Sequence, residues 1–113
     1  MVGRFANAIS TQSRSVICNG IVTTVAVSET KELSLYVQAC SALAVIERNL
    51  IEAGTAKARI LTAMVYISDI NNKPEFNSAW DNWVDRSNPP LRACFGATLE
   101  GDDLIEIVVT AKV

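Results

Sequence analysis

The sequence contains no histidine among its 113 residues. This absence excludes a Ser–His–Asp triad, a Cys–His pair, a histidine zinc site and any pH switch based on imidazole. The three cysteines, Cys18, Cys40 and Cys94, are widely spaced and form no Cys-x-x-Cys pair, so they give no metal or redox motif. We therefore expect reduced thiols, with Cys18 and Cys40 mostly buried as small apolar side chains.

Long apolar runs and concentrated charge are absent as well. No run approaches the roughly 18 residues of a membrane span, and residues 1–5 lack the apolar core of a signal peptide. The ten basic residues are scattered and the net charge is −2, so the sequence predicts no positively charged surface for binding nucleic acid. We expect a soluble, cytoplasmic protein, and the sequence contains no motif that predicts a cofactor or a metal.

What the chain does have is size for one domain and an excess of apolar residues. A chain of this length is expected to fold as a single domain over residues 1–113. Half of its residues are hydrophobic, which is a high share for so small a domain. We therefore expect part of the apolar surface to pack against another subunit.

The N-terminal half predicts three strands and a long helix. A weak strand is expected over residues 4–9, followed by a hairpin of residues 14–18 and 21–27, because Asn19-Gly20 suits a type I′ turn between β-branched residues. Residues 33–53 change to a helical period, with Tyr36, Cys40, Leu43, Ile46 and Leu50 as the apolar stripe. Gly54 fits the position after a helix end.

The C-terminal half predicts a strand, a helix and two further strands. Residues 60–69 form a nearly continuous apolar run, typical of a central strand covered on both faces. A helix should follow from about residue 71, with Trp80 and Trp83 as core or interface aromatics, and end before Pro89-Pro90. Strands over 91–99 and 104–113 should form a hairpin through residues 100–103.

This order, β-ββ-α-β-α-ββ, indicates an α+β domain with two helices on one face of a mixed sheet. Nothing in the sequence covers the other sheet face, which is therefore the expected oligomer surface. Two charges, Arg92 and Glu106, interrupt strands that should be buried. They form either an ion pair across neighbouring strands or an edge charge that blocks aggregation. Alternatively, they line a cleft where Arg92 binds a ligand carboxylate and Glu106 handles a water or proton.

The register of the last hairpin affects this choice. A four-residue loop, 100–103, places Glu106 on the face of Leu91, opposite Arg92. A five-residue loop, 99–103, places Arg92, Cys94 and Glu106 on one face. The sequence leaves both registers open, and a bulge or a site shared between subunits would also bring the groups together.

With these features the chain resembles the RidA (YjgF) family of small trimeric proteins, from about Arg4 to Val113. The resemblance rests on the order of elements and on four segments: Glu52-Ala53-Gly54 at the end of the long helix, Phe76-Asn77-x-x-Trp80, Pro90-Leu91-Arg92-Ala93-Cys94, and Glu106-Ile107 in the closing strand. It implies a chorismate-mutase-like fold and a homotrimer with three clefts between subunits.

The activity that this resemblance implies is hydrolysis of reactive 2-enamine and 2-imine intermediates of amino acids to 2-oxo acids and ammonia. By position, Arg92 matches the family arginine that grips the substrate carboxylate, and Glu106 matches the glutamate that positions the attacking water. Cys94 matches the cysteine beside the substrate, and Asn77 matches an asparagine near the cleft. With Arg92 close by, the Cys94 thiolate is expected to be stabilised.

The chain departs from the family at Thr24-Val25-Ala26, where a glycine is usual and where an extra methyl group is expected to narrow the pocket. It also lacks an aromatic residue in the N-terminal segment 10–13. The alternative function is a non-catalytic trimer that binds a small carboxylate metabolite. Ribonuclease activity, which is claimed for some relatives, finds little support in the weakly acidic charge balance.

Overall fold

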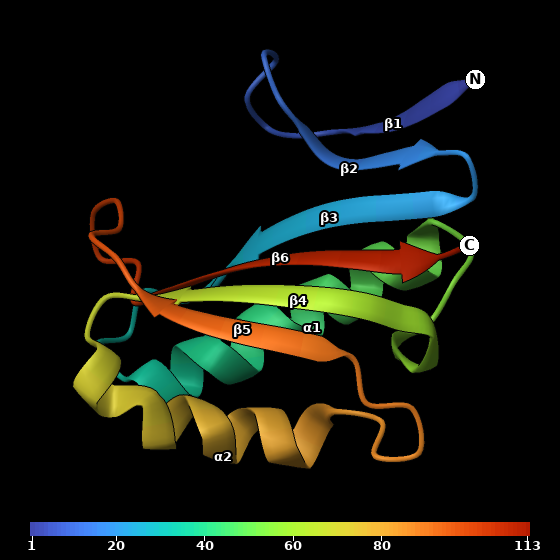
Figure 1. Ribbon diagram of the computed structural model, residues 1–113. Coiled ribbons are helices and arrows are strands. Elements are labelled where there is room, and N and C mark those ends of the chain that lie inside the picture. Colours follow the sequence, from blue (N-terminus) through green and yellow to red (C-terminus); the bar gives the residue numbers. More distant parts are fainter.

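The computed structural model describes all residues, 1–113, as one mixed six-stranded sheet with two helices on one of its faces (Figure 1). The strands lie in the order β1-β2-β3-β6-β4-β5. This is the predicted α+β class. The element bounds are β1 Val2–Ala6, β2 Ser13–Cys18, β3 Ile21–Val27, α1 Leu35–Glu52, β4 Ile60–Ile67, α2 Lys73–Trp83, β5 Leu91–Gly96 and β6 Ile105–Lys112, with short 3-10 turns η1 Lys57–Arg59 and η2 Ile70–Asn72.

The predicted hairpin of β2 and β3 is confirmed. Cys18 pairs with Ile21 across the turn, and both turn residues have positive φ, 54° at Asn19 and 74° at Gly20. These are the angles that a type I′ turn needs, and Asn and Gly adopt them most easily. The first strand pairs with β2 but ends at Ala6, three residues earlier than predicted.

Helix α1 begins where the Ser34 side chain accepts a hydrogen bond from the Val37 N–H, 3.3 Å away, as an N-cap serine does. Gly54, with φ 87°, follows its end as predicted. The predicted apolar stripe is right in its second half, where Leu43, Ile46 and Leu50 are buried. It is wrong at Tyr36 and Cys40, which are exposed, because the first turns bury Leu35, Gln38 and Ala39 instead.

Strands β5 and β6 do not form the predicted hairpin. β5 pairs in parallel with β4, and β6 enters between β3 and β4, antiparallel to both. The physical reason is that α2 connects β4 to β5 as a crossover, which returns the chain parallel to the strand it left. Residues 97–104 then carry the chain past β4 to the centre of the sheet.

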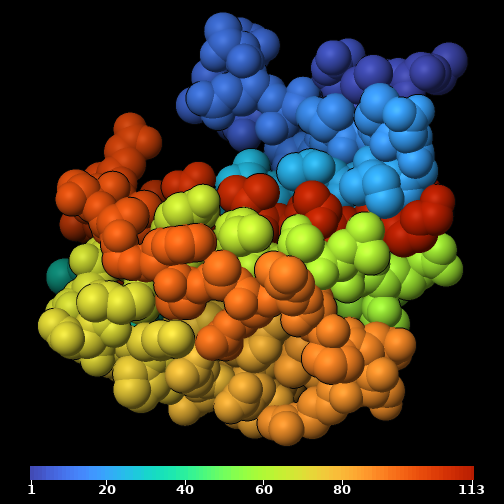
Figure 2. Space-filling view, in the orientation of Figure 1, coloured from blue at the N-terminus to red at the C-terminus, as the bar shows by residue number.

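One face of the sheet has no helix on it. Figure 2 views this face, on which side chains of β3, β6, β4 and β5 reach the surface. β4 is therefore covered on one face only, contrary to the prediction: Ala63, Val65 and Ile67 are fully buried, and the residues between them are partly exposed. Leu91 and Phe95 are 61% and 46% exposed, so the apolar excess of the sequence lies partly on this open face.

Two further observations concern residues outside the sheet core. The cysteines are free as predicted, but Cys18 and Cys40 are exposed rather than buried, because Cys18 adjoins the hairpin turn and Cys40 lies on the outer side of α1. Neither α1 nor α2 combines the length and the apolar character that crossing a membrane requires.

Candidate functional site

Arg92 lies on β5, the edge strand of the sheet, and points to the side of the helices. It pairs in register with Ala63, a fully buried residue of the helix-covered face, and paired residues of neighbouring strands share a face. Its Nη2 donates a hydrogen bond to Oδ1 of Asn77 on α2, 3.0 Å away. Its guanidinium carbon also lies 5.0 Å from the Phe76 ring centroid and 5.5 Å from that of Trp80. Arg92 is thus stacked on aromatic rings and oriented by an amide.

The structure also brings Cys94 to this place. Cys94 pairs with the buried Val65, so it lies on the same face as Arg92, one pleat further along β5. Burial raises the pKa of the Cys94 thiol, and the positive charges of Lys73 and Arg92 oppose this rise. The expectation that Arg92 stabilises the thiolate was therefore wrong in its net direction, because desolvation outweighs the charges.

Glu106 lies on β6 and on the opposite face. It pairs with Tyr66 of β4, and Tyr66 pairs with Phe95 of β5, against whose ring it stacks with a centroid distance of 5.5 Å. Glu106 therefore shares the open face with Phe95 and Leu91. The four-residue loop predicted the same face, but it assumed that β5 pairs with β6, whereas β4 lies between them in the structure. The register that placed it with Arg92 and Cys94 was wrong.

Glu106 lines a cavity of about 270 Å³ at one end of the open face. The cavity walls come from β3, from the segment after β1 and from the loop before β6: Asn7, Ile9, Gln12, Val25, Ala26, Val27, Glu100 and Asp103. Glu100, Asp103 and Glu106 make it acidic. Ala26, the position that differs from the family pattern, also lines this cavity, but it pairs with the buried Ile107, whereas Val27 pairs with Glu106. Its methyl group therefore points to the helix-covered face and not toward Glu106.

The hypothesis of an Arg92–Glu106 ion pair was wrong. Their strands are separated by β4, and the four ion pairs of the chain join other residues: Arg14–Glu52, Lys31–Asp103, Arg48–Glu29 and Lys57–Glu47. Of the four predicted site residues, the structure brings Arg92, Asn77 and Cys94 together and places Glu106 apart from them.

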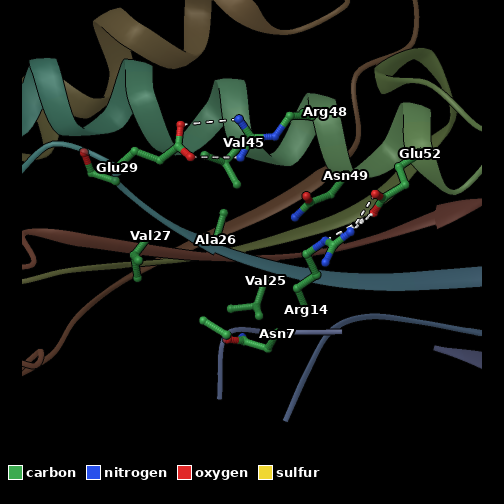
Figure 3. A pocket seen from close by; sticks show the side chains of 12 residues that line it. Asn7, Arg14, Val25, Ala26, Val27, Glu29, Val45, Arg48, Asn49 and Glu52 are labelled. Atoms are coloured by element: carbon green, nitrogen blue, oxygen red, sulfur yellow. Dashed lines mark hydrogen bonds and ion pairs between the residues drawn. The ribbon is translucent and has the colours of Figure 1, made fainter. Parts of the chain in front are cut away.

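A larger cavity, of about 520 Å³, contains none of the predicted site residues (Figure 3). It lies between α1, the end of β3 and the segment joining β1 to β2. Arg14 forms a bidentate ion pair with Glu52 on one side, with both oxygens at 2.6 Å, and Arg48 pairs with Glu29 on the other. The bond from Arg48 lowers the pKa of Glu29. All four charges are paired within the protein, which leaves no free charge for a ligand.

Lys73 is the residue of the Arg92 cluster that sequence reasoning missed. It is the first residue of α2 and lies one turn before Asn77, so both side chains occupy one face of the helix. The spacing of four residues on a predicted helix was the available signal. It indicated proximity to Asn77 but gave no sign that the charge of Lys73 acts on Cys94, because that depends on the way α2 packs along β5.

Comparison with known proteins agrees with this fold. The sequence model of the endoribonuclease L-PSP family matches residues 1–113. A RutC family protein of Haemophilus influenzae is 37% identical over 83 residues, which is 73% of this chain and 72% of that protein. A crystal structure of a YjgF family member from Neisseria meningitidis superimposes with a TM-score of 0.93 at 32% identity, covering 99% of this chain and 94% of the other. A protein of unknown function in the conserved Rid family from Yersinia pestis has a TM-score of 0.88 at 25% identity, covering 97% and 94% of the two chains.

Proposed function

This chain belongs to the endoribonuclease L-PSP (YjgF) family, and from that premise we propose that it hydrolyses 2-imino and 2-enamino acids to 2-oxo acids and ammonia. The observation that carries the proposal is Arg92. Arg92 is half-buried. Its guanidinium is oriented by Asn77 and two aromatic rings and has no carboxylate partner in the chain. An arginine held in this way presents its remaining N–H donors to the carboxylate of a ligand.

Hydrolysis of an imine asks little of the protein beyond binding and water delivery. Arg92 binds the substrate carboxylate, and Glu106 accepts a proton from a water whose oxygen adds to the iminium carbon. The resulting carbinolamine takes that proton on its nitrogen. The C–N bond then breaks, ammonia leaves, and the hydroxyl loses its proton as the carbonyl forms. No imidazole is needed, because the iminium carbon is already electrophilic.

We propose that the protein acts as a homotrimer in the cytoplasm, with its sites in clefts between subunits. Arg92 and Glu106 lie on opposite faces of one sheet, so neither face alone offers both groups to a ligand. The uncovered sheet face, with Leu91 and Phe95 exposed, supports packing against other copies. Sedimentation at micromolar concentration should give three times the mass of the chain, and a strictly monomeric profile would contradict the trimer.

The activity is tested with freshly generated 2-iminobutanoate, following release of 2-oxobutanoate. Arg92→Ala should raise KM by roughly tenfold to a hundredfold, the value of a charge-assisted hydrogen bond pair. Glu106→Gln should lower kcat by about a hundredfold while ligand affinity is kept. Arg86→Ala, which removes an exposed arginine that bonds to the Asp81 carbonyl, is the matched control and should behave as the wild type.

Two results would decide against the proposal. If Arg92→Ala is as fast as the wild type, the assigned carboxylate grip is wrong. If the wild type binds 2-oxobutanoate but shows no turnover, the protein is the alternative, a trimer that binds carboxylate metabolites without catalysis.

A further inference from the structure

Helix α2 and the turn before it run alongside β5 in the opposite direction, and two contacts fix their alignment. Ile70 packs so closely over Gly96 that a side-chain carbon added there would lie 3.2 Å from its Cβ. Asn77, near the middle of α2, bonds to Arg92 at the start of β5. Lys73 falls between these two contacts on the helix, as Cys94 falls between them on the strand. The positive charge of Lys73 accordingly acts on the Cys94 thiol, as does that of Arg92.

Lys73 and Arg92 are therefore two cations at one place, and neither is neutralised. No carboxylate lies within 4.0 Å of either, since the ion pairs of the chain involve other residues. Lys73 is moreover the first residue of an 11-residue helix, where the positive end of the helix dipole disfavours a lysine and favours an anion. The only acidic residue of that first turn, Glu75, is exposed and forms no ion pair. The cluster of Lys73 and Arg92 is therefore positively charged and suited to bind an anionic group from outside the chain.

The positions of Lys73 along α2 and of Arg92 along β5 define the ligand further. Lys73 and Asn77 are separated by one helical turn, about 6 Å along the axis, and Arg92 and Cys94 by a similar distance of about 6.6 Å along the strand. Because Asn77 meets Arg92 and Lys73 lies one turn before Asn77, the two cations start from different points of the cluster, and each can bind an anionic group of its own. A short chain with a carboxylate at each end spans them.

We propose that Lys73 is a specificity-determining residue, and that the substrates of this protein are imines of dicarboxylic amino acids. Arg92 binds the carboxylate next to the imine carbon, and the ammonium of Lys73 binds the carboxylate at the far end of the chain. This inference rests on the proposed function, because it takes the Arg92 site as the substrate site. It adds the substrate class, which the position of Lys73 selects through charge.

Binding is measured first, because it does not require turnover. Isothermal titration compares 2-oxoglutarate, which has two carboxylates, with 2-oxobutanoate, which has one. We expect the wild type to bind 2-oxoglutarate about tenfold more tightly, the effect of about one charge-assisted contact at a partly exposed site. Lys73→Met should weaken 2-oxoglutarate about tenfold and so remove that preference, with a smaller effect on 2-oxobutanoate, whereas Arg92→Met should weaken both ligands. Lys112→Met, which removes another lysine that has no ion pair, is the control.

Turnover then separates this inference from the proposed function. Imines of aspartate and of 2-aminobutanoate, both generated by an amino-acid oxidase, are compared as substrates. A wild type that hydrolyses both imines equally, with Lys73→Met unchanged in the ratio, overturns the role of Lys73 and leaves the proposed function standing. A wild type that prefers 2-oxoglutarate through Lys73 but hydrolyses neither imine supports the dicarboxylate site and contradicts the proposed function.

Discussion

Gln38 is the buried polar side chain whose loss should have the largest structural effect. It lies on α1, is 0% exposed, and uses every group of its amide. Its Nε2 donates to the carbonyls of Glu32, at 2.9 Å, and Asp102, at 3.0 Å, and its Oε1 accepts from the Leu104 N–H at 2.9 Å. One side chain thus fastens two loops to the helix, and one of these loops leads directly into the strand that carries Glu106.

The change Gln38→Leu keeps the approximate volume and removes all three bonds. Each main-chain group left without its partner costs about 1 kcal/mol at the low end of the usual range, because both loops are near solvent and water replaces part of the bond. The total is about 3 kcal/mol. The added apolar surface of leucine returns about 1 kcal/mol, so the net loss of unfolding free energy is about 2 kcal/mol. For a domain of this size it corresponds to a fall in Tm of about 8 °C.

Thermal unfolding followed by circular dichroism, at equal protein concentrations, tests this value. The control is Gln12→Leu, the same substitution at the other glutamine of the chain, which is exposed and should change stability by no more than about 0.5 kcal/mol. Equal Tm values for Gln38→Leu and Gln12→Leu would show that the three bonds do not hold the loops. Turnover should also fall in Gln38→Leu, because Leu104 lies two residues before Glu106.

Three other predictions follow from single positions. Gly20→Ala should lower the free energy of unfolding by about 1–2 kcal/mol, measured by chemical denaturation, because φ of 74° is unfavourable for a residue with a side chain. The control Gly3→Ala should be neutral, because an added side-chain carbon at Gly3 makes only ordinary van der Waals contact. In a variant without the other cysteines, alkylation of Cys94 by iodoacetamide should remain slow until the pH exceeds the ordinary thiol pKa, because burial raises the Cys94 pKa and the thiol stays protonated. A pH profile of the alkylation rate with its midpoint at or below the ordinary thiol pKa refutes this. Asn77→Asp should weaken carboxylate binding about tenfold, because a carboxylate 3.0 Å from Arg92 competes with the ligand; unchanged affinity for 2-oxobutanoate by calorimetry would contradict it.

The local elements were predictable because their signals are local. The positive φ at Asn19-Gly20 and the helix end at Gly54 follow from the conformations that these residues adopt most easily. The buried half of α1 follows from the helical period of Leu43, Ile46 and Leu50. The first turns of the same helix were predicted wrongly, because the polar Gln38 is buried there by its three loop contacts, which no periodicity of apolar residues indicates.

The candidate site was predictable in part for the same reason. Arg92 and Glu106 stand out as charges within apolar strands, and Asn77 and Cys94 follow from a motif. The contact of Asn77 with Arg92 required the packing of α2 on β5. Lys73 had no sequence signal of comparable strength, since a lysine at a helix start is usually a solvated charge.

By itself, the sequence determined which segments become strands and helices and which residues alternate to the same side within each strand, since both depend on neighbours along the chain. Only the tertiary structure decided that β5 pairs in parallel with β4 and that β6 enters between β3 and β4. This order sets Arg92 against α2 and Glu106 on the open face. The pairing of distant strands depends on which helices must cover which face, and alternation within one strand carries no information about its neighbours.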